Sequence, residues 1–193
     1  MKVEKALVGG LASVAALTAG SQIASAQDWT GAYAGLSVNS NSGTLPWSYP
    51  YDDYKLESGA VAGAFVGARW AAGNFLVGTE LAFQGAIGGD ANGDSSYPED
   101  YGFSSLIDLK LSLGKPIGRT LVYGFAGLSS GNVTGSSSGQ NYTAFGANFG
   151  LGADYRVSDM FSVGAEYTHR IMSGYDTTNA SNGTLALRAS FHF

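Results

Sequence analysis

The chain has 193 residues, of which 45% are hydrophobic and only 13% charged, and its formal net charge is −5. The charged fraction is about half of the average of about 25%, whereas the glycine content is about twice the usual share. With a mean hydropathy of +0.03, this composition excludes a disordered tail, a bundle of membrane helices and a basic protein that binds nucleic acid.

The first 26 residues have the organisation of a secretory signal peptide. Lys2 and Lys5 give a positively charged start, residues 6–19 are apolar, and Ala24 to Ala26 form a small-x-small cleavage site. The apolar run is shorter than the about 20 residues that a membrane-spanning helix needs. We therefore expect a cleaved signal peptide, followed by a single domain at residues 27–193.

The sequence contains no cysteine, which excludes disulfides, thiol catalysis and thiolate metal sites. Without the signal peptide the chain carries 8 basic and 14 acidic residues. This negative balance argues against phosphate backbones as partners.

Eight segments alternate apolar and polar residues with a period of two, which predicts β-strands. The clearest example places Leu109 and Leu111 on one face and Asp108 and Lys110 on the other. In chain order, the expected strands are residues 30–39, 59–70, 75–84, 107–114, 121–131, 145–155, 161–170 and 185–193. The segment 121–131 is mixed, and its faces cannot be assigned from the pattern.

The expected connections alternate between short and long. The short ones are residues 71–74, 116–120 and 157–160, and the long ones are 40–58, 87–102, 132–141 and 173–183. Consecutive strands then form an up-and-down meander with tight turns at one end and long loops at the other, as in bacterial outer-membrane barrels. The fold that we predict is all-β: an eight-stranded antiparallel transmembrane β-barrel.

Charged residues on the polar faces indicate which face points inward. A soluble barrel of the lipocalin type would turn its apolar face inward. Here the polar faces combine small residues with four bases and four acids, namely Arg69, Lys110, Arg170, Arg188, Glu80, Asp108, Asp154 and Glu166. Buried charges must be paired, so this balance favours a narrow polar lumen with an ion-pair network. The network either plugs the barrel or lines a small pore, and we favour the plug because eight strands leave little room.

Aromatic residues at the strand ends predict two interfacial girdles. At the short-turn end these are Trp29, Trp70, Phe75, Tyr155, Phe161 and Phe193, and at the other end Phe83, Phe103, Tyr142 and Phe145.

Several segments, in this order, resemble the small outer-membrane β-barrel surface antigens of Gram-negative bacteria, which share the OmpA-type membrane domain. They are residues 28–36, 73–80, 152–155 and 161–167, together with the C-terminal strand that ends at Phe193. The resemblance implies a surface-exposed envelope role without catalysis or cofactor. It also implies insertion by the outer-membrane assembly machinery, which would read the last strand through Leu185, Leu187, Phe191 and Phe193.

From this resemblance we expect a monomer in contact with outer-membrane lipid and lipopolysaccharide, with both ends of the mature chain in the periplasm. Since the sequence stops at Phe193, we expect no periplasmic peptidoglycan-binding domain. A small porin that passes ions or solutes is the main alternative function. An outer-membrane lipid-modifying hydrolase is the weaker one.

Two patterns suggest hydrolase chemistry. Residues 127–131 fit G-x-S-x-G around Ser129, and Asp154 and His169 follow in hydrolase order, but a loop is expected where the motif needs a strand-to-helix turn. Lipid A deacylases carry a serine two residues after their histidine, and this chain has Ile171 there. We therefore expect no enzyme, and interpret His169 as a lipid-facing residue near the headgroups.

The long loops are acidic. Asp90, Asn92 and Asp94 imitate the start of a calcium loop, but the glycine and the final glutamate of that motif are missing. We expect a solvated acidic surface, without a built metal site. Its residues are Asp52, Asp53, Glu57, Asp90, Asp94, Glu99, Asp100 and Asp176, against a single base, Lys55.

Overall fold

The computed structural model describes residues 29–45, 54–85, 101–135, 141–174 and 177–193. The expected signal peptide, the calcium-like motif and most of the acidic loop residues lie outside these ranges. Within them, no helix is long and apolar enough to cross a membrane.

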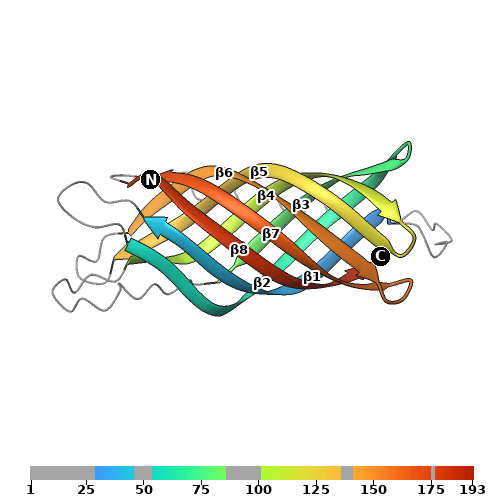
Figure 1. Ribbon diagram of the computed structural model, residues 1–193, viewed down its shortest axis with the longest axis horizontal. Coiled ribbons are helices and arrows are strands. Elements are labelled where there is room, and N and C mark those ends of the chain that lie inside the picture. Colours follow the sequence, from blue (N-terminus) through green and yellow to red (C-terminus); the bar gives the residue numbers. More distant parts are fainter. Residues whose placement is uncertain (1–28, 46–53, 86–100, 136–140, 175–176) are drawn as a thin grey trace, which may run out of the picture.

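Eight antiparallel strands form a closed barrel, which confirms the predicted fold (Figure 1). Each strand pairs with the next one in sequence, and the first pairs with the last. The strands are β1 (Gly31–Leu45), β2 (Tyr54–Ala72), β3 (Phe75–Gln84), β4 (Tyr101–Ile117), β5 (Thr120–Gly135), β6 (Asn141–Arg156), β7 (Phe161–Gly174) and β8 (Thr177–His192).

The short connections lie together at one end of the barrel, on the right in Figure 1. Residues 73–74, 118–119 and 157–160 make these turns, and we call this the short-turn end. Gly73 and Gly118 have φ values of 64° and 59°, a conformation that glycine adopts without steric cost. The C-terminal residue is held at the same end, because the Phe193 amide donates to the Ala32 carbonyl over 3.0 Å. In outer-membrane barrels this end faces the periplasm.

The two faces of each strand differ as the period-two pattern predicts. On β4, Leu109 and Leu111 are 48% and 67% exposed, whereas Asp108 and Lys110 are 3% and 4% exposed. A row of large apolar side chains therefore covers the outside of the barrel, and charged side chains lie inside it. This arrangement suits an outer surface in lipid and a polar interior.

Three of the expected long loops are shorter than predicted, because the strands continue beyond the apolar band. The expectation of a loop at 173–183 was wrong: β7 ends at Gly174 and β8 begins at Thr177. Asn41 pairs with Thr184 and Gly43 pairs with Asn182 across the β1–β8 ladder. The Asn, Gly and Ser residues that resemble turn signals in the sequence thus lie in strands, where their backbone groups are hydrogen-bonded and their inward side chains are buried.

Candidate functional site in the barrel lumen

All eight predicted charged residues point into the lumen and are almost completely buried. They come from six strands: β2 (Arg69), β3 (Glu80), β4 (Asp108, Lys110), β6 (Asp154), β7 (Glu166, Arg170) and β8 (Arg188). The structure connects them in three layers along the barrel, each of which contains at least one ion pair.

The central layer joins two carboxylates and two cations from opposite walls. Lys110 Nζ lies 3.2 Å from Glu80 Oε1 and 2.5 Å from Glu166 Oε1. Arg188 pairs with the same two glutamates through its two terminal nitrogens. In a barrel of eight strands, β3 faces β7 and β4 faces β8. The four side chains therefore form a closed ring of charge across the full width of the lumen.

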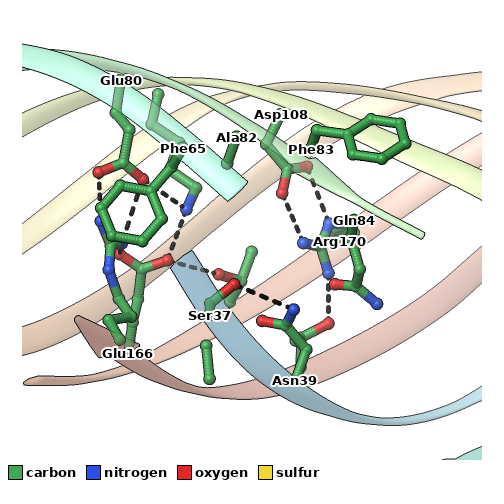
Figure 2. Close-up of a pocket in the computed structure, with 15 residues that line it drawn as sticks. Ser37, Asn39, Phe65, Glu80, Ala82, Phe83, Gln84, Asp108, Glu166 and Arg170 are labelled. Carbon is green, nitrogen blue, oxygen red and sulfur yellow. Dashed lines mark hydrogen bonds and ion pairs between the residues drawn. The ribbon is translucent and has the colours of Figure 1, made fainter. Parts of the chain in front are cut away.

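Aromatic side chains surround this ring. The hydroxyl groups of Tyr33 and Tyr123 donate to Glu80 and Glu166, each over 2.9 Å. The guanidinium of Arg188 lies 3.9 Å from the centre of the Phe65 ring, and Lys110 Nζ lies 4.9 Å from that of Phe125. Such contacts stabilise a cation that has lost its water. Figure 2 shows the Phe65 ring lying against the charges that link Glu80 and Glu166.

The layer toward the loop end is built on Asp108 and Arg170. Arg170 donates to both carboxylate oxygens of Asp108, from Nε over 2.9 Å and from Nη2 over 2.5 Å. Such bidentate pairing is the strongest geometry for these two groups. Ser129 Oγ also donates to Asp108, while Arg170 Nη1 donates to Asn182 and Thr184. Figure 2 shows this pair at some distance from the Glu80 and Glu166 cluster.

The layer at the short-turn end combines an ion pair with an indole. Arg69 Nη2 lies 2.8 Å from Asp154 Oδ2, and its guanidinium is 4.2 Å from the Tyr33 ring centre. The guanidinium of Arg156 lies 4.6 Å from the ring of Trp29, and His192 meets that ring edge-on at 5.6 Å. Trp29 is thus buried in the lumen at the short-turn end.

Our prediction that Trp29 belongs to the interfacial girdle was therefore wrong. Its side chain is 1% exposed, whereas Trp70 at the same end of the barrel is 49% exposed on the outside. The physical reason is the period of two along the chain: Trp29 lies an even number of residues before Tyr33 of β1, so both side chains point into the lumen. Two guanidinium groups then hold its indole ring inside the barrel.

Sequence reasoning also missed the aromatic part of the lumen. Tyr33, Phe65, Tyr123 and Phe125 are buried inside, where only small and polar residues were expected. On β5, whose faces could not be assigned, Leu121, Tyr123 and Phe125 point inward. A signal does exist: each of the four aromatic residues lies directly opposite a glycine on a neighbouring strand, in the pairs Tyr33–Gly67, Phe65–Gly35, Tyr123–Gly152 and Phe125–Gly150.

Little free space remains between the central and loop-end layers. The cavity there has a volume of about 20 Å³ and is lined by both ion-pair clusters. That volume holds about one water molecule.

The structure does not assemble the hydrolase constellation. Ser129 and Asp154 point into the lumen, whereas His169 lies on the outer face, 5.2 Å from the ring of Phe149. Ser129 is inside strand β5 rather than at a strand-to-helix turn. Within the described ranges, no group of three histidine or carboxylate side chains could hold a metal ion.

The outward side chains of the C-terminal strand form an apolar row. Leu185, Leu187, Phe191 and Phe193 are all exposed on the outside of the barrel, and the rings of Phe191 and Phe193 lie 5.3 Å apart. This row lies on and just beyond β8, the strand that closes the barrel against β1.

Comparison with solved structures shows the same fold. Ail, the attachment invasion locus protein of Yersinia pestis, has a TM-score of 0.55 and 18% identity, with 84% of this chain and 99% of that chain covered. Neisserial surface protein A (NspA) has a TM-score of 0.52 and 14% identity, with 85% and 98% covered.

Sequence comparison identifies relatives and the family. A 31 kDa outer-membrane immunogenic protein of Brucella melitensis is 26% identical over 191 residues, which cover 85% of this chain and 80% of the relative. A protein of the same name from Brucella suis matches equally well. The family described as "Outer membrane protein beta-barrel domain" matches residues 10–193. The chain therefore belongs to the outer-membrane β-barrel protein family, as its sequence motifs and its eight-stranded barrel indicate.

Proposed function

We propose that this protein is a non-conducting structural component of the outer membrane, exposed at the cell surface and without enzymatic activity. The observation that carries this proposal is the ring of Glu80, Lys110, Glu166 and Arg188, which crosses the lumen from wall to wall. An ion that passed this ring would have to separate buried partners, and breaking one buried pair costs about 3–5 kcal/mol.

Two further features support a closed lumen. Above and below the ring, the Asp108–Arg170 and Arg69–Asp154 pairs also connect strands that are not neighbours. Trp29 fills the periplasmic mouth between two guanidinium groups. A barrel filled in this way gains rigidity and loses the aqueous path that a porin needs.

The surface role follows from the membership of the family and from the relatives. The Brucella relatives are named as immunogenic outer-membrane proteins, and we extend surface exposure to this chain. The proposal includes a cleaved signal peptide at residues 1–26, a barrel domain at 27–193 and a monomeric state in outer-membrane lipid and lipopolysaccharide. It also includes recognition by the assembly machinery of the apolar row Leu185, Leu187, Phe191 and Phe193 on the last strand.

Ion release from proteoliposomes tests whether the lumen is closed. We expect liposomes that contain the purified protein to retain a trapped ion as well as empty liposomes do. The matched variant carries Glu80→Ser and Arg188→Ser together, which removes one charge from each wall and keeps the Lys110–Glu166 pair. If the ring blocks the lumen, liposomes that contain this variant should release the trapped ion. Rapid release by the wild-type protein would overturn the proposal.

A small porin is the second candidate, and one observation favours it. Polar side chains line the lumen continuously toward the loop end, where Asn39, Asn41, Gln84, Asn182 and Thr184 are all buried. Such a lining could hydrate a passing ion if the charged ring opened. Rapid leak through the wild-type protein, as fast as leak through the double variant, would support this function.

A further inference from the structure

A groove crosses the outer face of the barrel near the short-turn end. It has a volume of about 470 Å³ and extends over four neighbouring strands, from Thr120 on β5 to Leu187 on β8. Ala153 on β6 and Ala165 on β7 face each other directly in its floor. Because methyl groups lie here between larger side chains, the surface is hollowed.

The large outward side chains of the groove are apolar, whereas Asp154 and Arg188, which also line it, turn their side chains into the lumen. Tyr155 and Val163 form its wall toward the turns, and Leu187 lies opposite Ala165 on the other side. These side chains belong to the outward register, which faces the hydrocarbon of the bilayer in a membrane barrel. The occupant must therefore be an apolar chain that the membrane itself supplies, and a lipid acyl chain fits that description.

A cation is fixed at the end of this groove. Arg119 immediately precedes Thr120, and its guanidinium lies 5.6 Å from the centre of the Tyr155 ring, which lines the groove. Arg119 Nε donates to the Arg156 carbonyl over 2.9 Å, and Nη2 donates to the Val157 carbonyl over 2.6 Å. The side chain is held in place in this way, while the outer nitrogen Nη1 takes part in neither bond.

An arginine that is anchored by its inner donors is well suited to hold a phosphate. A guanidinium has five N–H donors in a planar fork, and it forms strong charge-assisted hydrogen bonds with phosphate oxygens. Asp159 is the acidic residue of the adjacent turn, and among the described residues no ion pair joins it to Arg119. The positive charge therefore remains available at the level of the headgroups.

We propose that Arg119 and the groove together bind one anionic diacyl phospholipid of the periplasmic leaflet. Its phosphate is held by Arg119 at the short-turn end, and one acyl chain lies over Ala153 and Ala165. This site is outside the lumen, so it is independent of whether the lumen conducts.

Lys115 provides an internal comparison. It lies at the same end of the barrel, and its ammonium is 5.9 Å from the ring of Phe75 on β3. It does not line the groove. If the basic rim only attracted anionic lipid in general, Lys115 and Arg119 would contribute equally.

Native mass spectrometry of the protein purified from membranes in detergent tests the proposal, with phosphatidylglycerol and phosphatidylcholine of identical acyl chains as probes. We expect one phosphatidylglycerol to be retained about fivefold better than phosphatidylcholine, the factor that one basic residue contributes near an anionic surface. Arg119→Gln should abolish this preference. Arg119→Lys should keep most of it, and Lys115→Gln should leave it unchanged.

The groove is tested by filling it. Ala153→Leu should reduce the retention of both lipids, whereas Ala147→Leu, an outward alanine on the same strand outside the groove, should not. Equal retention of the two lipids by the wild-type protein would overturn the proposal. Equal effects of Arg119→Gln and Lys115→Gln, or equal effects of the two leucine variants, would also overturn it. A loss of the preference in Arg119→Lys as complete as in Arg119→Gln would overturn it too, because Arg119 would then only support the turn.

Discussion

The ammonium of Lys110 on β4 lies 2.5 Å from Oε1 of Glu166 on β7, three strands away around the barrel. Together with Arg188 on β8 and Glu80 on β3, this contact links opposite walls of the lumen. The barrel is thus held by its backbone ladder and also by ion pairs across its interior.

Removal of Lys110 tests the energetic weight of this link. Lys110→Ala leaves two buried glutamates with a single cation between them, and we expect a loss of about 3–5 kcal/mol in the free energy of unfolding. Lys115→Ala, an exposed lysine on the same strand, should cost less than about 1 kcal/mol. Equilibrium unfolding in lipid vesicles measures both values. Similar small losses for the two variants would show that the ring does not stabilise the fold.

The lipid face is tested on the same strand. Leu109 points outward near the middle of the apolar band, and Leu109→Arg should destabilise the barrel by about 2–4 kcal/mol. Ile117 is also exposed on the outside, but it lies at the short-turn end. Ile117→Arg should cost about 0–1 kcal/mol. If unfolding in lipid shows equal losses for Leu109→Arg and Ile117→Arg, the bilayer does not surround the barrel at the level of Leu109.

The inward position of Trp29 predicts how tryptophan fluorescence responds to brominated lipids. Trp70 is on the lipid-facing side and Trp29 is enclosed in the lumen. Trp70→Phe should therefore remove much of the fluorescence loss that brominated lipids cause. Trp29→Phe should leave the size of this loss almost unchanged. The opposite result would place Trp29 in the interfacial girdle.

The pairing of aromatic residues with glycine predicts a steric effect. A Cβ added at Gly152 would lie 2.5 Å from Cζ of Tyr123. One added at Gly124 on the outer face would lie 3.7 Å from the nearest atom, the Gly150 carbonyl oxygen. Gly152→Ala should cost about 1–3 kcal/mol through overpacking, and Gly124→Ala much less. Unfolding in lipid vesicles compares the two. Equal costs would mean that the Tyr123 ring moves away freely.

The faces of most strands could be predicted because lipid and lumen impose opposite preferences on alternate residues. Asp108 and Lys110 lie between leucines on β4, so their inward position follows from the pattern alone. On β5 the pattern fails, because the lumen also accepts Tyr123 and Phe125 where Gly152 and Gly150 leave room. On this strand, the hydrophobicity of a residue therefore does not indicate whether its side chain faces the lipid or the lumen.

The partners of each charge could not be predicted from one sequence. The equal numbers of acids and bases indicated that the charges are paired. Which acid pairs with Lys110 depends on the stagger of the strands around the closed barrel, and that stagger is set by all eight strands together. The strand ends were missed for a related reason. Residues 177–184 contain turn-forming side chains, and their pairing with β7, together with that of residues 181–184 with β1, makes them a strand.

Single-channel conductance of the purified, folded protein in planar bilayers tests the central claim most directly. We expect a silent membrane, because we propose that the ring of Glu80, Lys110, Glu166 and Arg188 closes the lumen and that Trp29 fills its mouth. Steady and reproducible openings of the wild-type protein would contradict it, and would make the same charged residues the lining of a pore.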